Sequence, residues 1–307
     1  MQDDAARLKA TPLLSILVAN YNNGRFLPSM LESVFAQTYT NWGLIVVDDG
    51  STDDSLDVLR QWADERRLRV VEHGRNRGAG AAFATAASAS SGEILSMLGA
   101  DDALRADAAE AIVEAHARDP DAVLINSDLV ICDSLLRPLN QPSPYRPVSP
   151  GGTLIRDCCV SSFASFKRAA YLRTSGFDER LQRAVDHDLY LKLEEVGRLG
   201  YIREPLYLYR THPGGISQGE NGMRAAQFAL LARASAYRRR LGSTAPNLTA
   251  AEYREVLSTY FRREALHARK DGRLPALSYI RDAVRTLPSL SLEPSLWLTG
   301  VKCLLRA

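Results

Sequence analysis

The feature that most constrains the fold of this 307-residue chain is the segment 45–54, which reads IVVDDGSTDD. An apolar run ends abruptly at Asp48 and Asp49, and a glycine and two hydroxyl residues follow. A short apolar run bounded by turn residues is typical of a strand that is buried on both faces of a parallel sheet. Ligands of open α/β sheets bind beyond the carboxyl ends of such strands. We therefore expect the two carboxylates to lie at the mouth of a binding crevice.

The segment upstream has the same form. Residues 14–19 form a largely apolar run that ends at polar residues, and the stretch 26–39 has apolar residues at helical spacing. Strand, helix and strand within about forty residues form a βαβ unit, whose crossover is right-handed in nearly all proteins. The chain therefore begins as an α/β fold.

The patterns that follow continue this alternation. Ser51 or Thr52 is expected to cap a helix that reaches about residue 66. The proline-rich stretch 137–150 is predicted to be a surface loop, and 151–166 is ambiguous. The other expected strands span 68–72, 93–98, 122–127, 129–132, 201–204 and 206–210. The other expected helices span 79–90, 104–118, 167–174, 186–197, 222–241, 249–270 and 275–287.

The change from alternating to purely helical patterns near residue 219 suggests the domain organisation. We expect a loose N-terminal tail (1–11), one α/β domain (12–219) and a helical C-terminal extension (220–307). A hydrophobic content of 46% is enough to give a domain of this size a large core.

Composition excludes several classes of protein. The formal net charge of +2 argues against a nucleic-acid partner. None of the four cysteines has zinc-site spacing. No apolar stretch reaches the roughly 20 residues that span a bilayer, and the acidic N-terminus lacks the apolar core of a secretory signal. The expected location is therefore the cytoplasm.

Four later motifs carry polar groups suited to chemistry. The motif 76–80 (NRGAG) opens a helix, where backbone N–H groups can face a phosphate. The motif 98–102 (LGADD) ends a strand with oxygen ligands that suit a divalent cation. The motif 185–193 (VDHDLYLKL) places a carboxylate at a helix start, where it can accept a proton from a substrate. The motif 209–213 (YRTHP) adds an arginine and a histidine.

Taken in order, these motifs resemble those of the family 2 inverting glycosyltransferases with the GT-A fold, over roughly residues 12–218. The resemblance implies a Rossmann-like α/β fold: a mixed, mainly parallel sheet flanked by helices, here with a C-terminal helical extension. It also implies transfer of a sugar from a nucleotide-diphospho-sugar, expected to be a UDP-sugar, to a hydroxyl of a saccharide or lipid-linked saccharide. Such a reaction would serve bacterial cell-surface polysaccharide or glycolipid synthesis, with Mn²⁺ or Mg²⁺ as cofactor.

The resemblance assigns the donor site to residues far apart in the sequence. It implies that Ala19, Tyr21 and Asp49 hold the nucleotide base, while Asp48 supports the loop. Arg77 and Gly78 fall where the family contacts the diphosphate.

The same resemblance supplies the metal and catalytic residues. Asp101, which also falls in the nucleotide site, and Asp102 match the acidic metal motif, although Gly99 replaces its first acid. His212 is expected to ligate the metal or contact the diphosphate. Asp186 falls on the family's catalytic base, although Val185 replaces the glutamate before it. Arg210 is expected to contact a phosphate or the acceptor.

Two other functions remain open at this point. Gly99 would also suit a sugar-nucleotide-binding protein that has lost catalysis. A nucleotidyltransferase is less favoured, because the loop after the first strand lacks the glycine-rich, basic pattern of that class.

The C-terminal helices have two interpretations. In the first, they pack on the catalytic domain or on a second subunit in a homodimer. In the second, the apolar segment 294–306, which carries two cations, contacts a membrane that bears a lipid-linked acceptor.

Overall fold

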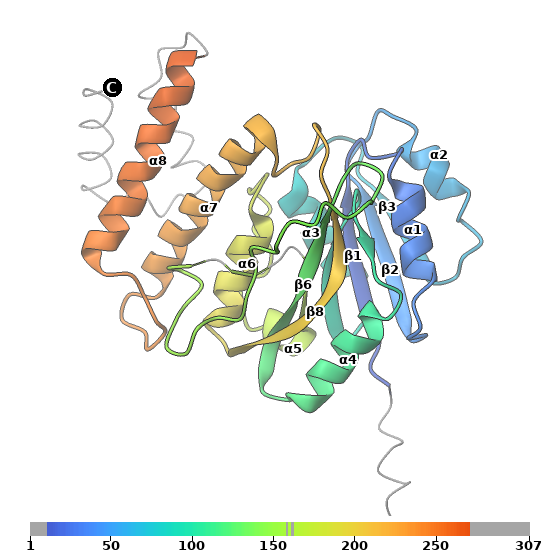
Figure 1. Cartoon of the computed structure of the whole chain (residues 1–307), viewed down its shortest axis with the longest axis horizontal. Helices are drawn as coiled ribbons and strands as arrows, with labels where there is room; N and C mark the ends of the chain where they lie inside the picture. The colour runs from blue at the N-terminus through green and yellow to red at the C-terminus, as the bar shows by residue number, and fades with distance from the viewer. Residues whose placement is uncertain (1–10, 158, 161–162, 271–307) are drawn as a thin grey trace, which may run out of the picture.

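The computed structural model describes residues 11–157, 159–160 and 163–270 of the chain (Figure 1). Within this part, eight strands form one sheet in the order β3-β2-β1-β4-β7-β6-β8-β5. The strands are β1 (Leu14–Asn20), β2 (Trp42–Asp48), β3 (Leu68–Glu72), β4 (Ile94–Gly99), β5 (Ala103–Leu104), β6 (Ala122–Cys132), β7 (Ala164–Lys167) and β8 (Arg198–Arg210).

The sheet is mixed and mainly parallel. Strands β3, β2, β1 and β4 pair in parallel, and so do β6 and β8. The short strand β7 runs antiparallel between β4 and β6, and β5 runs antiparallel at the edge beside β8. The long parallel strands therefore all end at one edge of the sheet, which is the edge where ligands bind in open α/β folds.

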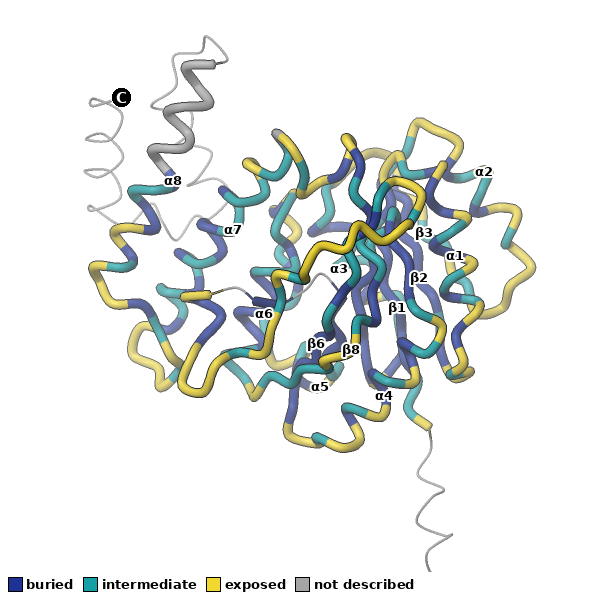
Figure 2. The backbone as a smooth tube through the Cα atoms, viewed as in Figure 1, coloured by how far each residue is buried: buried dark blue, intermediate teal, exposed yellow. Residues whose placement is uncertain are grey.

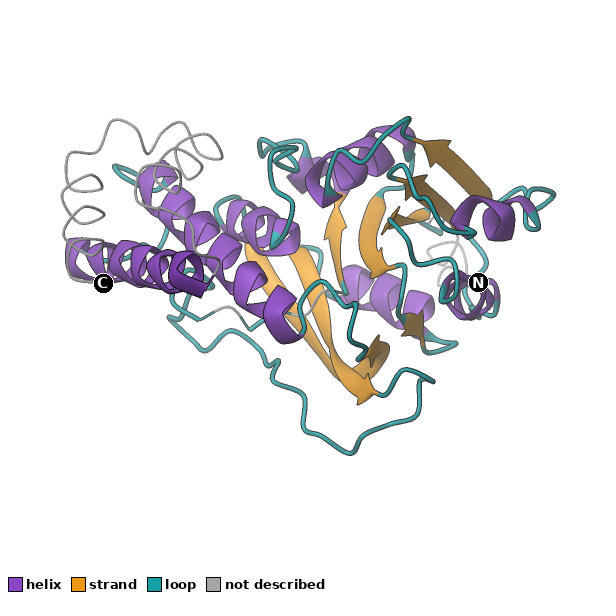
Figure 3. Ribbon diagram, turned by 90° about the horizontal axis from the view of Figure 1, so that it is seen from above, coloured by secondary structure: helices purple, strands orange, loops and turns teal. Residues whose placement is uncertain are grey.

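Helices cover both faces of the sheet, as the view in Figure 3 shows. Helices α1, α2 and α4 cover one face, and α3, α6 and α7 cover the other. The helices are α1 (Leu27–Phe35), α2 (Ser55–Arg60), α3 (Ala79–Ala89), α4 (Ala108–Arg118), α5 (Arg168–Tyr171), α6 (Val185–Glu194), α7 (Gly219–Arg239) and α8 (Ala250–Lys270).

Strand β1 shows why both faces carry a core. Ile16 and Val18 point to the side of α1, whereas Leu17 points to the side of α3, and all three are fully buried. Successive side chains of a strand point to opposite faces, so an almost continuous apolar run can only lie between two layers. The buried centre of the sheet is plain in Figure 2. The α/β expectation, with a mixed sheet flanked by helices, is confirmed.

The helix after β2 begins later than the sequence suggested. Ser51 caps no helix, because its hydroxyl accepts the backbone N–H of Asn22 and its own N–H donates to Asp48. Helix α2 begins at Ser55, whose N–H donates to Asp53 Oδ1 at 3.0 Å. The hydroxyls after the two acids therefore brace the loops at the sheet edge.

Two other expectations change in the structure, and a third holds. The expected start of a helix at 104 is wrong, because residues 103–104 form β5 and α4 begins at Ala108. The paired short strands expected at 122–132 and 201–210 are the continuous strands β6 and β8, with bulges at the expected breaks. The loop at 137–150 is confirmed.

Helices α7 and α8 share a core with the sheet. Leu231 of α7 and Tyr253 of α8 belong to the same buried cluster as Leu189 of α6 and Leu95 of β4. The helix expected at 275–287 and the apolar segment 294–306 lie outside the described residues. Within the residues that are described, no helix combines the length and the apolar character needed to cross a bilayer.

Candidate functional site

A cavity of about 590 Å³ lies beyond the carboxyl ends of β1, β2 and β4. A volume of this size is typical of pockets for small organic ligands. Several residues singled out from the sequence line it, although they come from six separate segments: Ala19, Tyr21, Asp49, Gly78, Asp101, Asp102, Asp186 and His212.

The two acids after β2 have different surroundings. Asp48 is buried and accepts bonds from the side chain of Asn20 at 2.8 Å and from the backbone N–H of Ser51 at 2.9 Å. It therefore joins the ends of β1 and β2, which is the supporting role expected of it. Asp49 is also buried, but it lines the cavity.

Asp49 organises the loop that precedes α3. Its carboxylate accepts the backbone N–H of Arg77 at 3.0 Å and that of Gly78 at 2.7 Å. His73 Nδ1 lies 2.6 Å from Asp49 Oδ1, and His73 Nε2 lies 3.0 Å from the hydroxyl of Thr85. The N–H groups of Arg77 and Gly78 therefore face this carboxylate, whereas the sequence pattern suggested that they would be free to face a phosphate. A carboxylate has about four acceptor positions, so few remain for a ligand.

Tyr21 is suited to contact a planar ligand. It follows Ala19 and Asn20 at the end of β1, and 45% of its surface is exposed although it lines the cavity. An exposed aromatic ring beside a cavity offers a face for stacking.

Asp101 and His212 meet across the cavity. Asp101 Oδ2 lies 2.9 Å from His212 Nε2, and the imidazole is buried against the ring of Phe26 with centroids 4.5 Å apart. His212 Nδ1 is buried without a hydrogen-bond partner among the described residues. This pair joins the end of β4 to the loop after β8.

Asp102 is held away from solvent by β8. Its carboxylate accepts the hydroxyl of Tyr207 and, at 2.7 Å, the backbone N–H of Arg210. Burial, and then the charge of Asp101, raise the pKa of Asp102 well above its usual range. Of the two acids in the motif, Asp101 is thus the one with oxygens available to the cavity.

Gly99 is part of this arrangement. Its N–H donates to the hydroxyl of Tyr207 at 3.2 Å, and a Cβ at this position would clash with Asp102 Oδ2. An acid at this position would require the buried contact between Tyr207 and Asp102 to move.

Asp186 lies in the first turn of α6 and lines the cavity. The backbone N–H of His187 donates to its Oδ1 at 2.9 Å, so Oδ2 is open to accept a proton. Ala184, just before the helix, has a positive φ of 52°, which turns the chain sharply into α6. Asp188 instead is buried and pairs with Lys192 at 2.6 Å.

Tyr209 also lines the cavity and carries a group that could exchange a proton. Burial raises its pKa to about 12, so the phenol keeps its proton near neutral pH and is a poor base. Asp186 is the better base on this ground.

Two arginines expected at the site do not line the cavity. The Arg210 guanidinium donates to the carbonyl of Ser134 at 2.7 Å and to the hydroxyl of Ser29 at 2.6 Å, and it lies over the Phe26 ring. The Arg77 side chain pairs with Glu179 at 3.0 Å. Both guanidinium groups are thus engaged by the protein itself.

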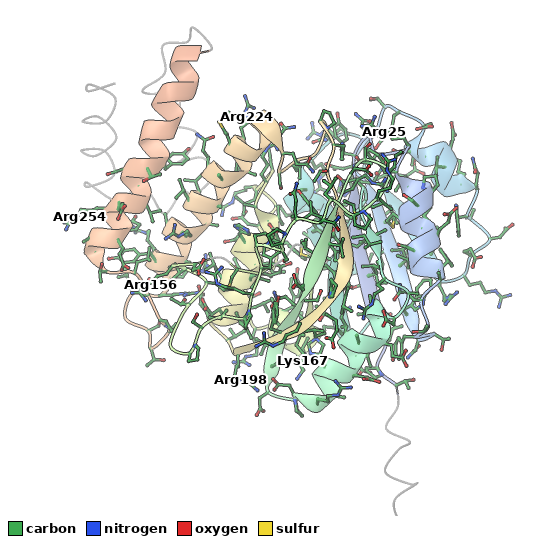
Figure 4. The ribbon with its side chains drawn as sticks, viewed as in Figure 1. Arg25, Arg156, Lys167, Arg198, Arg224 and Arg254 are labelled. Atoms are coloured by element: carbon green, nitrogen blue, oxygen red, sulfur yellow. The ribbon has the colours of Figure 1, made fainter. Side chains whose placement is uncertain are left out.

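Two other arginines, which the sequence analysis missed, line the cavity instead: Arg25 and Arg183. Arg25 stacks over Phe26 at 4.4 Å, beside His212, and Figure 4 labels it at the upper edge of the sheet. Arg183 donates to the carbonyl of Ile216 at 2.6 Å. Both lie just outside helices, in segments that no motif marks; only their nearness in sequence to Tyr21 and Asp186 would have drawn attention to them.

Comparison with known proteins gives a consistent result. The family described as glycosyl transferase family 2 matches residues 15–175, which is more than half of the chain. A chondroitin synthase of Escherichia coli is 31% identical over 66% of this chain and 30% of its own length. The glycosyltransferase GlyG of Streptococcus pneumoniae serotype 4 is 32% identical over 68% of this chain and 74% of its own length. The chain spans less than a third of the length of several relatives, including 21% of a hyaluronan synthase of Pasteurella multocida.

Solved structures show the same fold at low sequence identity. Staphylococcus aureus TarS 1-349 in complex with UDP-GlcNAc has a TM-score of 0.64 and 17% identity, over 90% of this chain and 80% of its own. A mannosyltransferase from Pyrobaculum calidifontis in complex with GDP-Man and Mn²⁺ has a TM-score of 0.57 and 18% identity, over 97% and 87%. These similarities show the GT-A type of sheet and helices.

Proposed function

The chain belongs to glycosyl transferase family 2, and on that premise we propose that it transfers a sugar from a UDP-sugar to an acceptor hydroxyl with inversion at the anomeric carbon. The observation that carries this proposal is the cavity itself. It gathers the base-binding candidates at β1 and β2, the pair Asp101–His212, and the proton acceptor Asp186 into one volume of about 590 Å³. Complexes of TarS with UDP and with UDP-GlcNAc support a UDP-sugar as the donor.

We place the nucleotide-sugar donor in the half of the cavity that lies at the sheet edge. The nucleotide base would stack on Tyr21 beside Ala19, with Asp49 and Gly78 beneath it. Asp49 would contact the base with its own oxygens, and it would also position the loop at residues 77–78 that lines the donor site. Arg25 would balance the charge of the diphosphate, because Arg77 is paired with Glu179.

The residues fit a divalent cation only in part. No group of three or more histidine, cysteine or acidic side chains that could hold a metal occurs among the described residues. Mg²⁺ and similar ions are often held by one or two carboxylates together with substrate phosphates. Asp101 with His212 meets that requirement, whereas the Asp102 carboxylate is already satisfied by Tyr207 and Arg210. A bound Mn²⁺ or Mg²⁺ would supply electrostatic stabilisation of the departing diphosphate.

The reaction needs only one proton transfer by the protein. Asp186 accepts the proton of the acceptor hydroxyl as that oxygen attacks the anomeric carbon. The bond from the anomeric carbon to the diphosphate oxygen breaks on the opposite side, and the nucleoside diphosphate leaves with the electron pair. The configuration inverts in this single displacement, so no covalent enzyme intermediate forms.

A thermal-shift screen of nucleotide sugars, with and without Mn²⁺, tests this function. We expect UDP-sugars to raise the melting temperature more than GDP-sugars, and Mn²⁺ to enlarge the shift. Slow hydrolysis of the stabilising donor should be detectable without an acceptor. Failure of every nucleotide sugar to stabilise the chain would contradict the proposal.

Gly99 favours a second candidate function, because it replaces an acid of the family motif. A sugar-nucleotide-binding protein without catalysis would show the Mn²⁺-dependent stabilisation but neither transfer nor hydrolysis. The same samples therefore separate the two functions.

A further inference from the structure

Arg183 supplies a positive charge beside the proposed base. It lies three residues before Asp186 and lines the cavity. Its guanidinium donates to the carbonyl of Ile216 at 2.6 Å and to Oδ1 of Asn221 at 3.1 Å. Both acceptors are neutral, and no carboxylate pairs with Arg183 among the side chains that the structure describes. Within the described residues, the Arg183 guanidinium therefore makes hydrogen bonds but no ion pair.

A second cation stands near the first. Arg224 is exposed near the start of α7, at the upper edge of the molecule in Figure 4, and has no ion-pair partner in the described part of the chain. Burial lowers the pKa of Arg183, and the charge of Arg224 lowers it further. Two like charges in proximity disfavour each other, so an anion between them would be favoured.

Among the other charges that line the cavity, Asp186 is the proposed base, and Asp49, Asp101 and Arg25 have contacts of their own. Asp101 meets His212, and Asp49 meets His73. Arg25 stacks on Phe26, the ring that also packs against His212. We therefore assign Arg25 to the donor's diphosphate. Arg183 instead lies just before helix α6, which carries the base Asp186.

We propose that the acceptor is anionic: it carries a carboxylate or phosphate group near the hydroxyl that receives the sugar, and Arg183, with Arg224 beside it, binds that group. This inference rests on the proposed function, because it takes Asp186 as the base that marks the acceptor side. A guanidinium presents a planar fork of donors that matches either anion.

Binding of three matched probes to the full chain, saturated with UDP and Mn²⁺, tests this acceptor site by NMR titration. The probes are methyl β-D-glucuronide, methyl β-D-glucoside 6-phosphate and the neutral methyl β-D-glucoside, which differ only at C6. We expect at least one anionic probe to bind about tenfold more tightly than the neutral one. The preferred anion distinguishes a carboxylate from a phosphate acceptor. Equal affinities for all three probes would overturn the proposal.

Arg183→Gln should remove this preference. Because Arg183 also holds the loop at Ile216, Arg224→Gln provides a second variant with no such contact, and it should lower the preference about two- to threefold. Arg254→Gln, at an exposed residue of α8 on the opposite side of the molecule from Arg25 in Figure 4, is the control and should change nothing. A preference that survives in both Arg183→Gln and Arg224→Gln would refute the assignment.

UDP affinity separates this inference from the proposed function. Arg183→Gln should keep the wild-type affinity for UDP, and loss of UDP binding in that variant would place Arg183 on the donor and overturn the acceptor assignment. If the wild type binds no nucleotide sugar but still prefers an anionic probe when titrated without UDP, the proposed function fails and only the anion site at Arg183 remains.

Discussion

At the scale of single residues, the site depends on which polar groups the protein leaves open. Asp48 and Asp102 are fully engaged by neighbours, while Asp101 and Asp186 have oxygens toward the cavity. Adjacent acids in one motif therefore have different roles. Sequence could place both acids at a strand end, but which one β8 would cover depends on contacts across more than a hundred residues.

The arginines illustrate the same limit. Arg210 stands in a recognisable motif, yet Ser29 and Ser134 bind its guanidinium. Arg25 and Arg183 stand in no motif, yet they line the cavity. A long side chain can reach several partners, so its direction is fixed by tertiary contacts that the local sequence does not encode.

Asp101→Asn should abolish the Mn²⁺-dependent part of the UDP thermal shift. The amide oxygen is a weaker ligand for a hard cation than a carboxylate, whereas the base-binding side of the cavity is unchanged. Thermal-shift titration of UDP with and without Mn²⁺ measures this. Asp57→Asn, at an exposed site on α2, is the matched control. A full Mn²⁺ effect in Asp101→Asn would exclude Asp101 as the ligand.

His116 should make stability depend on pH. It is buried, and burial lowers its pKa from 6.5 to about 4. The unfolded chain then binds more protons than the folded chain between these values, so stability is complete above pH 6.5 and falls as the pH drops toward 4. The slope is about 1.4 kcal/mol per pH unit for one proton.

His116→Gln should remove this slope. Ser165, whose hydroxyl donates to the carbonyl of Ile125, accepts the His116 ring N–H at 3.0 Å. Glutamine can donate the same bond but does not titrate. Urea unfolding of both proteins at several values between pH 4 and 6.5 would compare the slopes. Equal slopes would show that His116 does not titrate as inferred.

At the level of secondary-structure elements, local sequence patterns predicted which segments form strands and helices more accurately than they predicted where those segments begin and end. The apolar runs of β1, β2 and β4 required burial on both sides, so their positions were predictable. The start of α2 was not predictable, because the Ser51 hydroxyl accepts the backbone N–H of Asn22 in another loop. Strand β5 has two residues and exists only because it pairs with β8, which no local pattern shows.

Helix α6 carries the base at one end and is fixed to α7 at the other. The Arg240 side chain has no exposed surface and donates to Glu194 at 2.9 Å, Glu195 at 3.1 Å and the carbonyl of Leu191 at 2.7 Å. These contacts hold the C-terminal end of α6, and with it the direction in which Asp186 enters the cavity.

Arg240→Met should therefore destabilise the chain by about 3–5 kcal/mol, because it leaves the largely buried carboxylate of Glu194 without its ion-pair partner, whereas Glu195 keeps Arg239. Arg198→Met removes an exposed ion pair with Asp119 and should cost less than about 1 kcal/mol. Urea unfolding gives both values. A similar small effect for the two variants would mean that the buried pairs do not anchor α6.

At the scale of the whole molecule, the helical extension and the sheet form one structure among the described residues. The division near residue 219 follows a real change in pattern, but Leu230, Leu231 and Tyr253 pack into the core that begins at the sheet. Periodicity reveals that a helix has an apolar face, and only the fold reveals which surface covers it.

A chain truncated after residue 218 tests this continuity. It would expose the buried faces of α6 that α7 covers, so we expect it to aggregate or to unfold without a cooperative transition. The full chain, measured by circular dichroism and light scattering, is the reference. A monomeric truncated chain with the wild-type melting temperature would instead make residues 12–218 an independent domain.

The proposed function depends above all on Asp186, which accepts the proton in a sugar transfer from a bound nucleotide sugar. Asp186→Asn tests this role, measured for both UDP-sugar affinity and the rate of transfer or donor hydrolysis. We expect unchanged affinity and a rate lower by about 10²–10⁴-fold, since general base catalysis typically contributes that much. A wild-type rate in this variant would contradict the account.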